Sequence, residues 1–184
     1  MSVVPTASGE EALAARPDGA PAAGRRQSVP RRELLFLIAA ALVFLIDQVT
    51  KSLAVYYLLP LVSVRLAGFF QLTYVENRGA AFGVLQNQTL FFVVLGLVVV
   101  AGLALSYRHL PGISPLLNVC LGLQLGGALG NLVDRLRQGY VVDFVDLTWW
   151  PVFNVADAAI VLGVSVIAYY LIRGPRASAA TDHA

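Results

Sequence analysis

Four long segments that are almost free of charge constrain this chain more than any other feature. They predict helices at about residues 34–59, 89–107, 114–137 and 154–172. Each helix has close to the ~20 residues that are needed to cross about 30 Å of hydrocarbon. The chain is 58% hydrophobic and only 13% charged, outside the usual composition of soluble domains. Because the alternating pattern of barrel strands is missing, we expect an α-helical membrane protein with four transmembrane helices.

The two ends differ in composition from this membrane domain. Residues 1–33 are rich in Ala, Pro, Gly and Arg and predict a disordered cytoplasmic extension, and residues 174–184 predict a cytoplasmic tail. A cleaved signal peptide is the alternative for the first apolar segment, since arginines precede it. That segment continues through Asp47 and Lys51 without a convincing cleavage site. We therefore assign residues 34–173 to one four-helix domain with an uncleaved first helix.

The arginines predict the orientation in the membrane. One set flanks the chain ends and the connection between the second and third helices: Arg25, Arg26, Arg31, Arg32, Arg108, Arg173 and Arg176. A smaller set lies on the other side: Arg65, Arg78, Arg135 and Arg137. Since cytoplasmic loops carry the excess of positive charge, both termini are expected in the cytoplasm.

The connections on the other side predict additional structure. Residues 61–75 are rich in Val, Leu, Phe, Thr and Tyr and predict two short strands, followed by a glycine-containing turn. We expect a small extracytoplasmic β-cradle over residues 61–83 and a loop over residues 138–152. The third helix also carries glycines at four-residue spacing, which favour close helix packing without implying dimerisation: Gly122, Gly126 and Gly130.

Carboxylates and asparagines border or interrupt these apolar segments. A charged group at membrane depth is costly, so each one is a candidate for function. Asp143 and Asp157 are separated by only 13 residues and flank a short loop, so both lie at the same membrane face. Two further groups share one helix face each by spacing: Asn131, Asp134 and Arg135 in the third helix, and Asn154 and Asp157 in the fourth. Two polar faces that meet at one membrane surface favour a site over scattered helix caps.

Several sequence motifs are absent, and their absence argues against the corresponding kinds of chemistry. The two histidines, His109 and His183, are remote and there is no HExxH motif, so neither a metal nor a cofactor is expected. A GxSxG motif and a phosphate-binding glycine loop are also missing. The net charge of +2 and the lack of a basic patch argue against nucleic acid. The single lysine, Lys51, could pair with Ser52 as a dyad, but its four-residue spacing from Asp47 favours a structural ion pair.

The remaining chemistry is that of paired carboxylates. Two aspartates held close together share a proton and titrate as a coupled pair. The ionised one can take a proton from water while the protonated one donates to a carbonyl oxygen. Helix capping or solvation is the alternative for a lone aspartate, and we prefer it for Asp146. Asp134 and Arg135 could likewise form a structural pair.

The motifs around these residues resemble the lipoprotein signal peptidases (signal peptidase II), membrane aspartic proteases of bacteria. The resemblance covers about residues 34–172 in five ordered blocks: DQVTK (47–51), ENRGAAFG (76–83), GGALGNLVDR (126–135), VVDF (141–144) and FNVADAAI (153–160). It implies cleavage of a prolipoprotein just before a lipobox cysteine that carries diacylglycerol, with Asp143 and Asp157 as the catalytic residues. The implied supporting residues are Asn77, Asn131, Arg135 and Asn154 lining the site, Asp47 and Lys51 tying the first helix to the cradle, and Asp134 in a structural role.

The resemblance also implies a multi-pass protein of the bacterial inner membrane, with its active site at the extracytoplasmic face. It is expected to act as a monomer in contact with membrane lipid and without a cofactor. Residues 1–33 have no counterpart in the family pattern. Two alternatives stay open: a small proton-coupled carrier that relays protons through Asp134, Asp143 and Asp157, and an inactive scaffold. No internal repeat supports the carrier, and the presence of both aspartates disfavours the scaffold.

Overall fold

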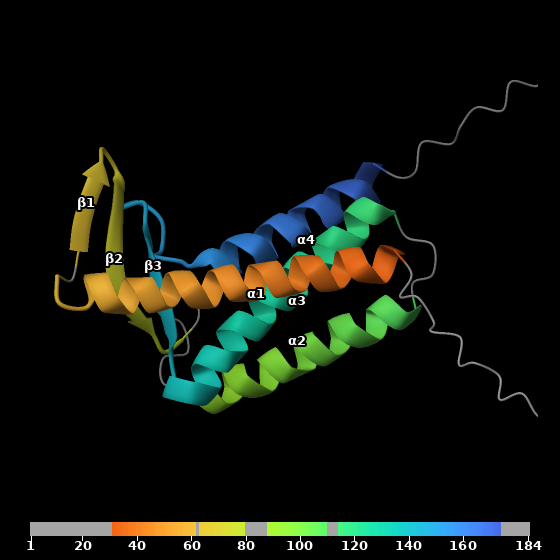
Figure 1. Ribbon diagram of the computed structural model, residues 1–184, viewed down its shortest axis with the longest axis horizontal. Coiled ribbons are helices and arrows are strands. Elements are labelled where there is room, and N and C mark those ends of the chain that lie inside the picture. The colour runs from red at the N-terminus through yellow and green to blue at the C-terminus, as the bar shows by residue number, and fades with distance from the viewer. Residues whose placement is uncertain (1–30, 62, 80–87, 110–113, 174–184) are drawn as a thin grey trace, which may run out of the picture.

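Four long helices form the membrane domain in the computed structural model, which describes residues 31–61, 63–79, 88–109 and 114–173 (Figure 1). The helices are α1 (Arg31–Leu58), α2 (Thr89–His109), α3 (Pro115–Gln138) and α4 (Val155–Arg173). Each is long and apolar enough to cross a membrane. Most of the predicted extension, the predicted tail, residue 62 and residues 80–83 of the predicted cradle lie outside the described residues.

Residues 31–33 belong to helix α1 and correct the boundary of the predicted extension, which ended at residue 33. Arginine and glutamate have high helix propensity, so these polar residues extend the apolar helix backwards. Glu33 also lies in the first turn, where a negative charge interacts favourably with the helix dipole.

A three-stranded antiparallel sheet lies at one end of the helical bundle, opposite the start of α1 and the end of α4 (Figure 1). Its order is β1 (Ser63–Ala67), β2 (Phe70–Asn77) and β3 (Val141–Asp146). The two strands predicted from residues 61–75 are β1 and β2. Strand β3 falls inside the segment that we expected to be a loop. Its sequence VVDFVD has β-branched and aromatic residues, and it pairs with β2 so that Val75 lies opposite Asp143.

Helix α3 is the central element, since it packs against each of the other three helices. Glycines in α3 allow its close packing against α1 and α4. A Cβ atom at Gly122 would lie 2.5 Å from the carbonyl oxygen of Phe36 in α1, and one at Gly127 would lie 2.6 Å from that of Ala156 in α4. The close packing predicted from the glycine spacing is thus confirmed, and the glycine face contacts α1.

The end of α3 directs the chain into the sheet. Gly139 caps the helix in a left-handed conformation, with φ of 83°, and its N–H donates to the carbonyl oxygen of Arg135 at 3.1 Å. Strand β3 begins two residues later, so the polar end of α3 lies next to Asp143. On the other side of the strand, Val142 and Phe144 form a buried cluster with the last turns of α1.

We predict that Gly122→Val destabilises the protein by ~1–3 kcal/mol, because the added side chain would collide with the backbone of α1. Thermal unfolding of the protein in detergent measures this effect. Gly102→Ala in α2 is the matched control, since a Cβ atom there meets no atom within 4 Å. A melting temperature of Gly122→Val equal to that of the control would contradict the packing described.

Candidate active site

Asp143 and Asp157 line the same cavity, although they come from different elements. Asp143 lies in the middle of β3 and is 1% exposed, and Asp157 lies in the first turn of α4. The cavity has a volume of about 330 Å³. Its polar lining comes from Asn77, Gly79, Arg135, Asp143 and Asp157. The spacing of the two aspartates in the sequence therefore brings them to one site, as expected from the short loop between them.

Two asparagines connect the carboxylates. The amide of Asn154 donates to Asp143 Oδ1 at 2.7 Å, and the amide of Asn131 donates to Asp157 Oδ1 at 2.8 Å. The two asparagines contact each other, with Asn154 Nδ2 3.2 Å from Asn131 Oδ1. A continuous hydrogen-bonded chain thus runs from one aspartate to the other, and it fixes the carboxylates relative to each other.

The start of α4 orients Asp157. Asn154 precedes the helix, and its side-chain oxygen accepts from the backbone N–H of Asp157 at 2.9 Å. In return, Asp157 Oδ2 accepts from the backbone N–H of Asn154 at 3.3 Å. This reciprocal pair is a capping box, with aspartate in the place where glutamate is usual. The local sequence Asn-Val-Ala-Asp therefore both begins the helix and fixes the carboxylate.

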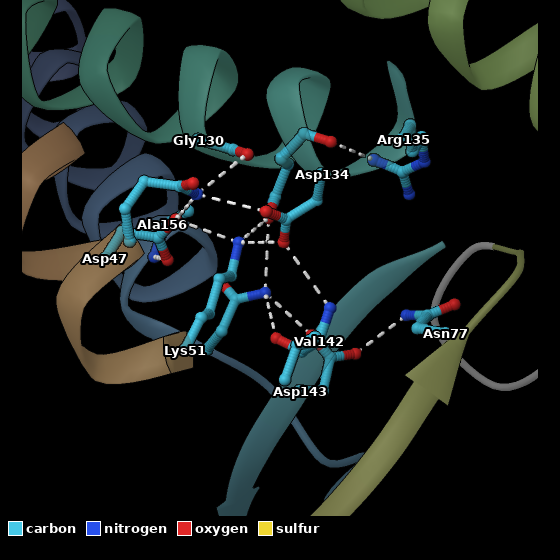
Figure 2. A network of polar contacts seen from close by, with 12 residues as sticks. Asp47, Lys51, Asn77, Gly130, Asp134, Arg135, Val142, Asp143 and Ala156 are labelled. Carbon is cyan, nitrogen blue, oxygen red and sulfur yellow. Dashed lines mark hydrogen bonds and ion pairs between the residues drawn. The ribbon is translucent and has the colours of Figure 1, made fainter. Parts of the chain in front are cut away.

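Asp143 is held in a position that favours its protonated form. Burial is the main cause that raises the pKa of Asp143 to about 7, and the negative charge of Asp157 adds to it. Hydrogen bonds from Asn154 and from Asn77, whose amide lies 2.8 Å from Asp143 Oδ2, oppose the shift (Figure 2). At neutral pH this carboxyl group can therefore hold or release a proton.

Behind the aspartates, Lys51 lies at the centre of a buried polar cluster (Figure 2). Its Nζ is 2.8 Å from Asp47 Oδ2, from Asp134 Oδ2 and from Asn131 Oδ1. The predicted ion pair between Asp47 and Lys51 is confirmed. Ser52 donates to the carbonyl oxygen of Gln48 at 2.7 Å, so its hydroxyl does not form a dyad with Lys51.

The carboxylates of this cluster also bind backbone groups. Asp47 Oδ1 accepts from the N–H of Ala156 at 3.0 Å, and Asp134 Oδ2 accepts from that of Val142 at 3.4 Å. The sequence analysis considered an ion pair between Asp134 and Arg135. In the structure, Asp134 instead pairs with Lys51. Adjacent helical residues point about 100° apart, so Asp134 faces α1 while Arg135 faces the cavity.

Arg135 connects the cavity to α2 and to the end of β2. Its guanidinium donates to the carbonyl oxygen of Gly79 at 3.3 Å and to that of Asn131 at 3.4 Å. The same group lies 5.0 Å from the ring centre of Phe92. These contacts hold a positive charge beside the two aspartates.

The candidate residues predicted from the sequence fall into three positions. Those that line the cavity are Asn77, Arg135, Asp143 and Asp157. Asn131 and Asn154 lie behind the aspartates and contact them, and Asp47, Lys51 and Asp134 form the buried cluster.

Sequence reasoning missed three groups of residues. Gln48 donates to Asp134 Oδ1 at 3.0 Å and so belongs to the cluster; its position next to Asp47 in an apolar helix was the available signal. The apolar wall of the cavity includes Trp150, Phe153 and Ile160. Asp146, for which we preferred capping or solvation, is 8% exposed and accepts hydrogen bonds from β2.

We predict that Lys51→Met destabilises the protein by roughly 3–5 kcal/mol, because it leaves two buried carboxylates without their shared cation. Thermal unfolding in detergent measures the loss. Arg78→Met is the matched control, since its ion pair with Glu76 is exposed and contributes little. Equal melting temperatures for the two variants would show that the cluster does not stabilise the fold.

Comparisons with known proteins show which family the chain is similar to. A family model described as signal peptidase (SPase) II matches residues 39–173. The chain is 52% identical over 138 residues to the lipoprotein signal peptidase of Moorella thermoacetica, covering 74% of this chain and 92% of that protein. It is 53% identical over 138 residues to that of Caldanaerobacter subterraneus subsp. tengcongensis, covering 74% and 94%.

A solved structure is also similar. It is described as a bacterial membrane enzyme determined by the in meso method at 2.3 Å, and it matches with a TM-score of 0.66 and 30% identity over 75% of this chain and 87% of that one. This chain belongs to the lipoprotein signal peptidase (signal peptidase II) family, and is a multi-pass membrane aspartic peptidase that cleaves the signal peptides of prolipoproteins.

Proposed function

We propose that Asp143 and Asp157 are the catalytic pair, and that they cleave the peptide bond just before a diacylglyceryl-modified cysteine. The observation that carries this proposal is their convergence on one cavity, joined by Asn131 and Asn154. Within the described residues, no group of three or more His, Cys, Asp or Glu side chains could hold a metal ion. The proposed reaction needs only the two carboxylates and water.

In the proposed mechanism, Asp143 carries the shared proton and Asp157 acts as the base. Asp157 takes a proton from a water molecule, whose oxygen attacks the scissile carbonyl carbon, while Asp143 donates its proton to the carbonyl oxygen. The tetrahedral intermediate then collapses: the C–N bond breaks as Asp157 gives its proton to the leaving amine, and one hydroxyl of the intermediate returns a proton to Asp143. The raised pKa of Asp143 supports this division of roles.

The surrounding residues support binding of an extended peptide. Arg135 presents N–H donors to the cavity beside the aspartates, where peptide carbonyl groups could accept them. We propose that Asn77 positions Asp143 from the side of the sheet, and that Asn131 and Asn154 position both carboxylates from behind. Asp47, Lys51 and Asp134 support them structurally, with no direct contact to substrate.

We propose that the active site faces the extracytoplasmic side and that both termini are cytoplasmic. The sheet and the aspartates lie at one end of the bundle, and the start of α1 and the end of α4 lie at the other (Figure 1). The excess of arginines flanks the start of α1 and the end of α4, which predicts that this second end is cytoplasmic. At the surface beside the aspartates, the acyl chains of a substrate can stay in the bilayer while its peptide enters the cavity. We propose that the protein acts as a monomer in the bacterial inner membrane.

The two alternative functions are less well supported. Because the chain belongs to a peptidase family, we reject the hypothesis of a proton-coupled carrier. An inactive scaffold would not need both aspartates in one cavity with a hydrogen-bonded chain between them.

We predict that Asp143→Asn and Asp157→Asn each lower cleavage by roughly 10³-fold or more, because either change removes the acid or the base. The assay is the size shift of a diacylglyceryl-modified prolipoprotein in membranes at equal enzyme expression. Glu76→Gln is the matched control, since this carboxylate is in the same sheet but paired at the surface. Cleavage by either aspartate variant at the level of the control would refute the catalytic pair.

We predict that kcat/KM falls tenfold per pH unit above about pH 7, as Asp143 loses its proton. Asn77→Ala removes a hydrogen bond that favours the ionised carboxylate, so the pKa of Asp143 rises further and the alkaline limb moves to higher pH. The measurement is the pH profile of kcat/KM for both proteins. An alkaline limb that stays in place or moves to lower pH in Asn77→Ala would contradict the assignment of the proton to Asp143.

A further inference from the structure

Asp146 is a buried carboxylate that the proposed mechanism does not use. It ends β3 and directly precedes the turn that contains both tryptophans of the chain, Trp149 and Trp150. Its side chain is almost completely surrounded by protein. Asp146 lies outside the hydrogen-bonded chain that joins the catalytic aspartates, so another role must explain its burial.

Both oxygens of Asp146 are occupied. Oδ2 accepts from Gln71 Nε2 at 2.5 Å and from Thr73 Oγ1 at 2.9 Å, which anchors the carboxylate to β2. Oδ1 accepts from the backbone N–H of Thr148 at 2.7 Å. The hydrogen bond from Gln71 is the main cause that lowers the pKa of Asp146, so the group stays ionised and is a strong acceptor. The carboxylate therefore connects the sheet to the turn.

The turn at Thr148 needs such support. Thr148 has a φ of 65°, and it is the only described residue other than glycine with a positive φ. The N–H of Trp149 donates to the carbonyl oxygen of Leu147 at 2.8 Å, which closes a three-residue turn around Thr148. A turn of this kind with positive φ at its centre is rare and strained, and a β-branched residue makes it less favourable still. Strained residues persist only where neighbouring contacts hold them.

The turn places the tryptophans beside the catalytic aspartates. Trp150 lines the cavity that contains Asp143 and Asp157. Together with Trp149 and Phe153 it also lines an adjacent apolar cavity of about 350 Å³, which reaches Asp157 from the side of α4. Phe153 is fixed by two backbone hydrogen bonds with Val145, at 2.8 and 3.0 Å, which close the loop behind the tryptophans.

We propose that Asp146 is a positioning residue for substrate binding. Through the strained turn at Thr148 it holds Trp149 and Trp150 as the apolar wall of the site, against which the lipid-modified part of the substrate packs. This inference rests on the proposed function, since it assigns the wall to the same cavity. The chemistry that the wall recognises is hydrocarbon, because the adjacent cavity is lined by leucine, valine, alanine and aromatic side chains beside Asp157.

Intrinsic fluorescence tests the positioning directly, because the only two tryptophans of the chain are in this turn. In Asp146→Ala we expect a red-shifted emission maximum and stronger quenching by acrylamide than in the wild type. Adding Thr148→Gly to Asp146→Ala should restore part of both signals, since glycine adopts a positive φ without strain. Ser63→Ala is the control. It removes a hydroxyl group from the same sheet, and this hydroxyl contacts Thr73 and not the turn.

Kinetics test the consequence for the reaction. Asp146→Ala should raise KM for a diacylglyceryl-modified substrate by roughly tenfold and leave kcat within about twofold, because the catalytic carboxylates keep their contacts. The alkaline limb of the pH profile should stay in place. The double variant with Thr148→Gly should recover part of the KM. If Asp146→Ala does not fold, Asp146→Asn keeps the Oδ1 acceptor and should show smaller changes in the same direction.

Two results would overturn the proposal. Unchanged emission in Asp146→Ala, or in Asp146→Asn where the alanine variant does not fold, would show that the carboxylate does not hold the turn. A loss of kcat at unchanged KM, without recovery by Thr148→Gly, would show that Asp146 acts on the chemistry or only on the sheet. Failure of the wild type to cleave the lipid-modified substrate would instead refute the proposed function, while the fluorescence comparison would still decide whether Asp146 positions the turn.

Discussion

The shared ion cluster around Lys51 is the interaction on which the rest of the site depends. One ammonium group lies between two carboxylates, Asp47 and Asp134, in the interior of a membrane domain. Such charges are costly to bury unless every group is paired and hydrogen-bonded. Here the carboxylates also accept hydrogen bonds from the N–H groups of Ala156 and Val142, so α1, α3, α4 and β3 meet at one point. A different arrangement of these elements would leave a charge unpaired, and the cluster therefore specifies their positions.

Close packing and polar pairing depend on each other in this cluster. A Cβ atom at Gly130 would lie too close to the carboxylate of Asp47. A larger residue there would push α1 away and separate Lys51 from Asn131, which is its contact with the hydrogen-bonded chain between the two aspartates. The glycine face of α3 thus has a function beyond packing. It lets the ammonium group of Lys51 on α1 reach Asn131, whose amide donates to Asp157.

The sequence predicted those features that depend on local periodicity. Four apolar segments predicted the helices, and a four-residue spacing predicted the pair of Asp47 with Lys51. It did not predict the partner of Asp134 or the hydrogen bonds of Asp146, because these depend on how separate elements lie against each other. Strand β3 was missed for a related reason. Its residues favour a strand, but a six-residue segment between two helices forms one only through pairing with β2, which the local sequence does not show.

The cavity has one polar wall and one apolar wall, and the proposed function uses both. The polar wall, with Asn77 and Arg135, supplies donors in fixed positions. The apolar wall includes Trp150 and Phe153, whereas Asp143 is buried in β3, and this burial is the main cause that raises its pKa to about 7. In the proposed mechanism, burial of Asp143 in the sheet therefore supplies the acid, while the apolar wall is available to bind the hydrocarbon part of the substrate. The two walls thus have separate proposed roles, acid–base chemistry on the polar side and substrate binding on the apolar side.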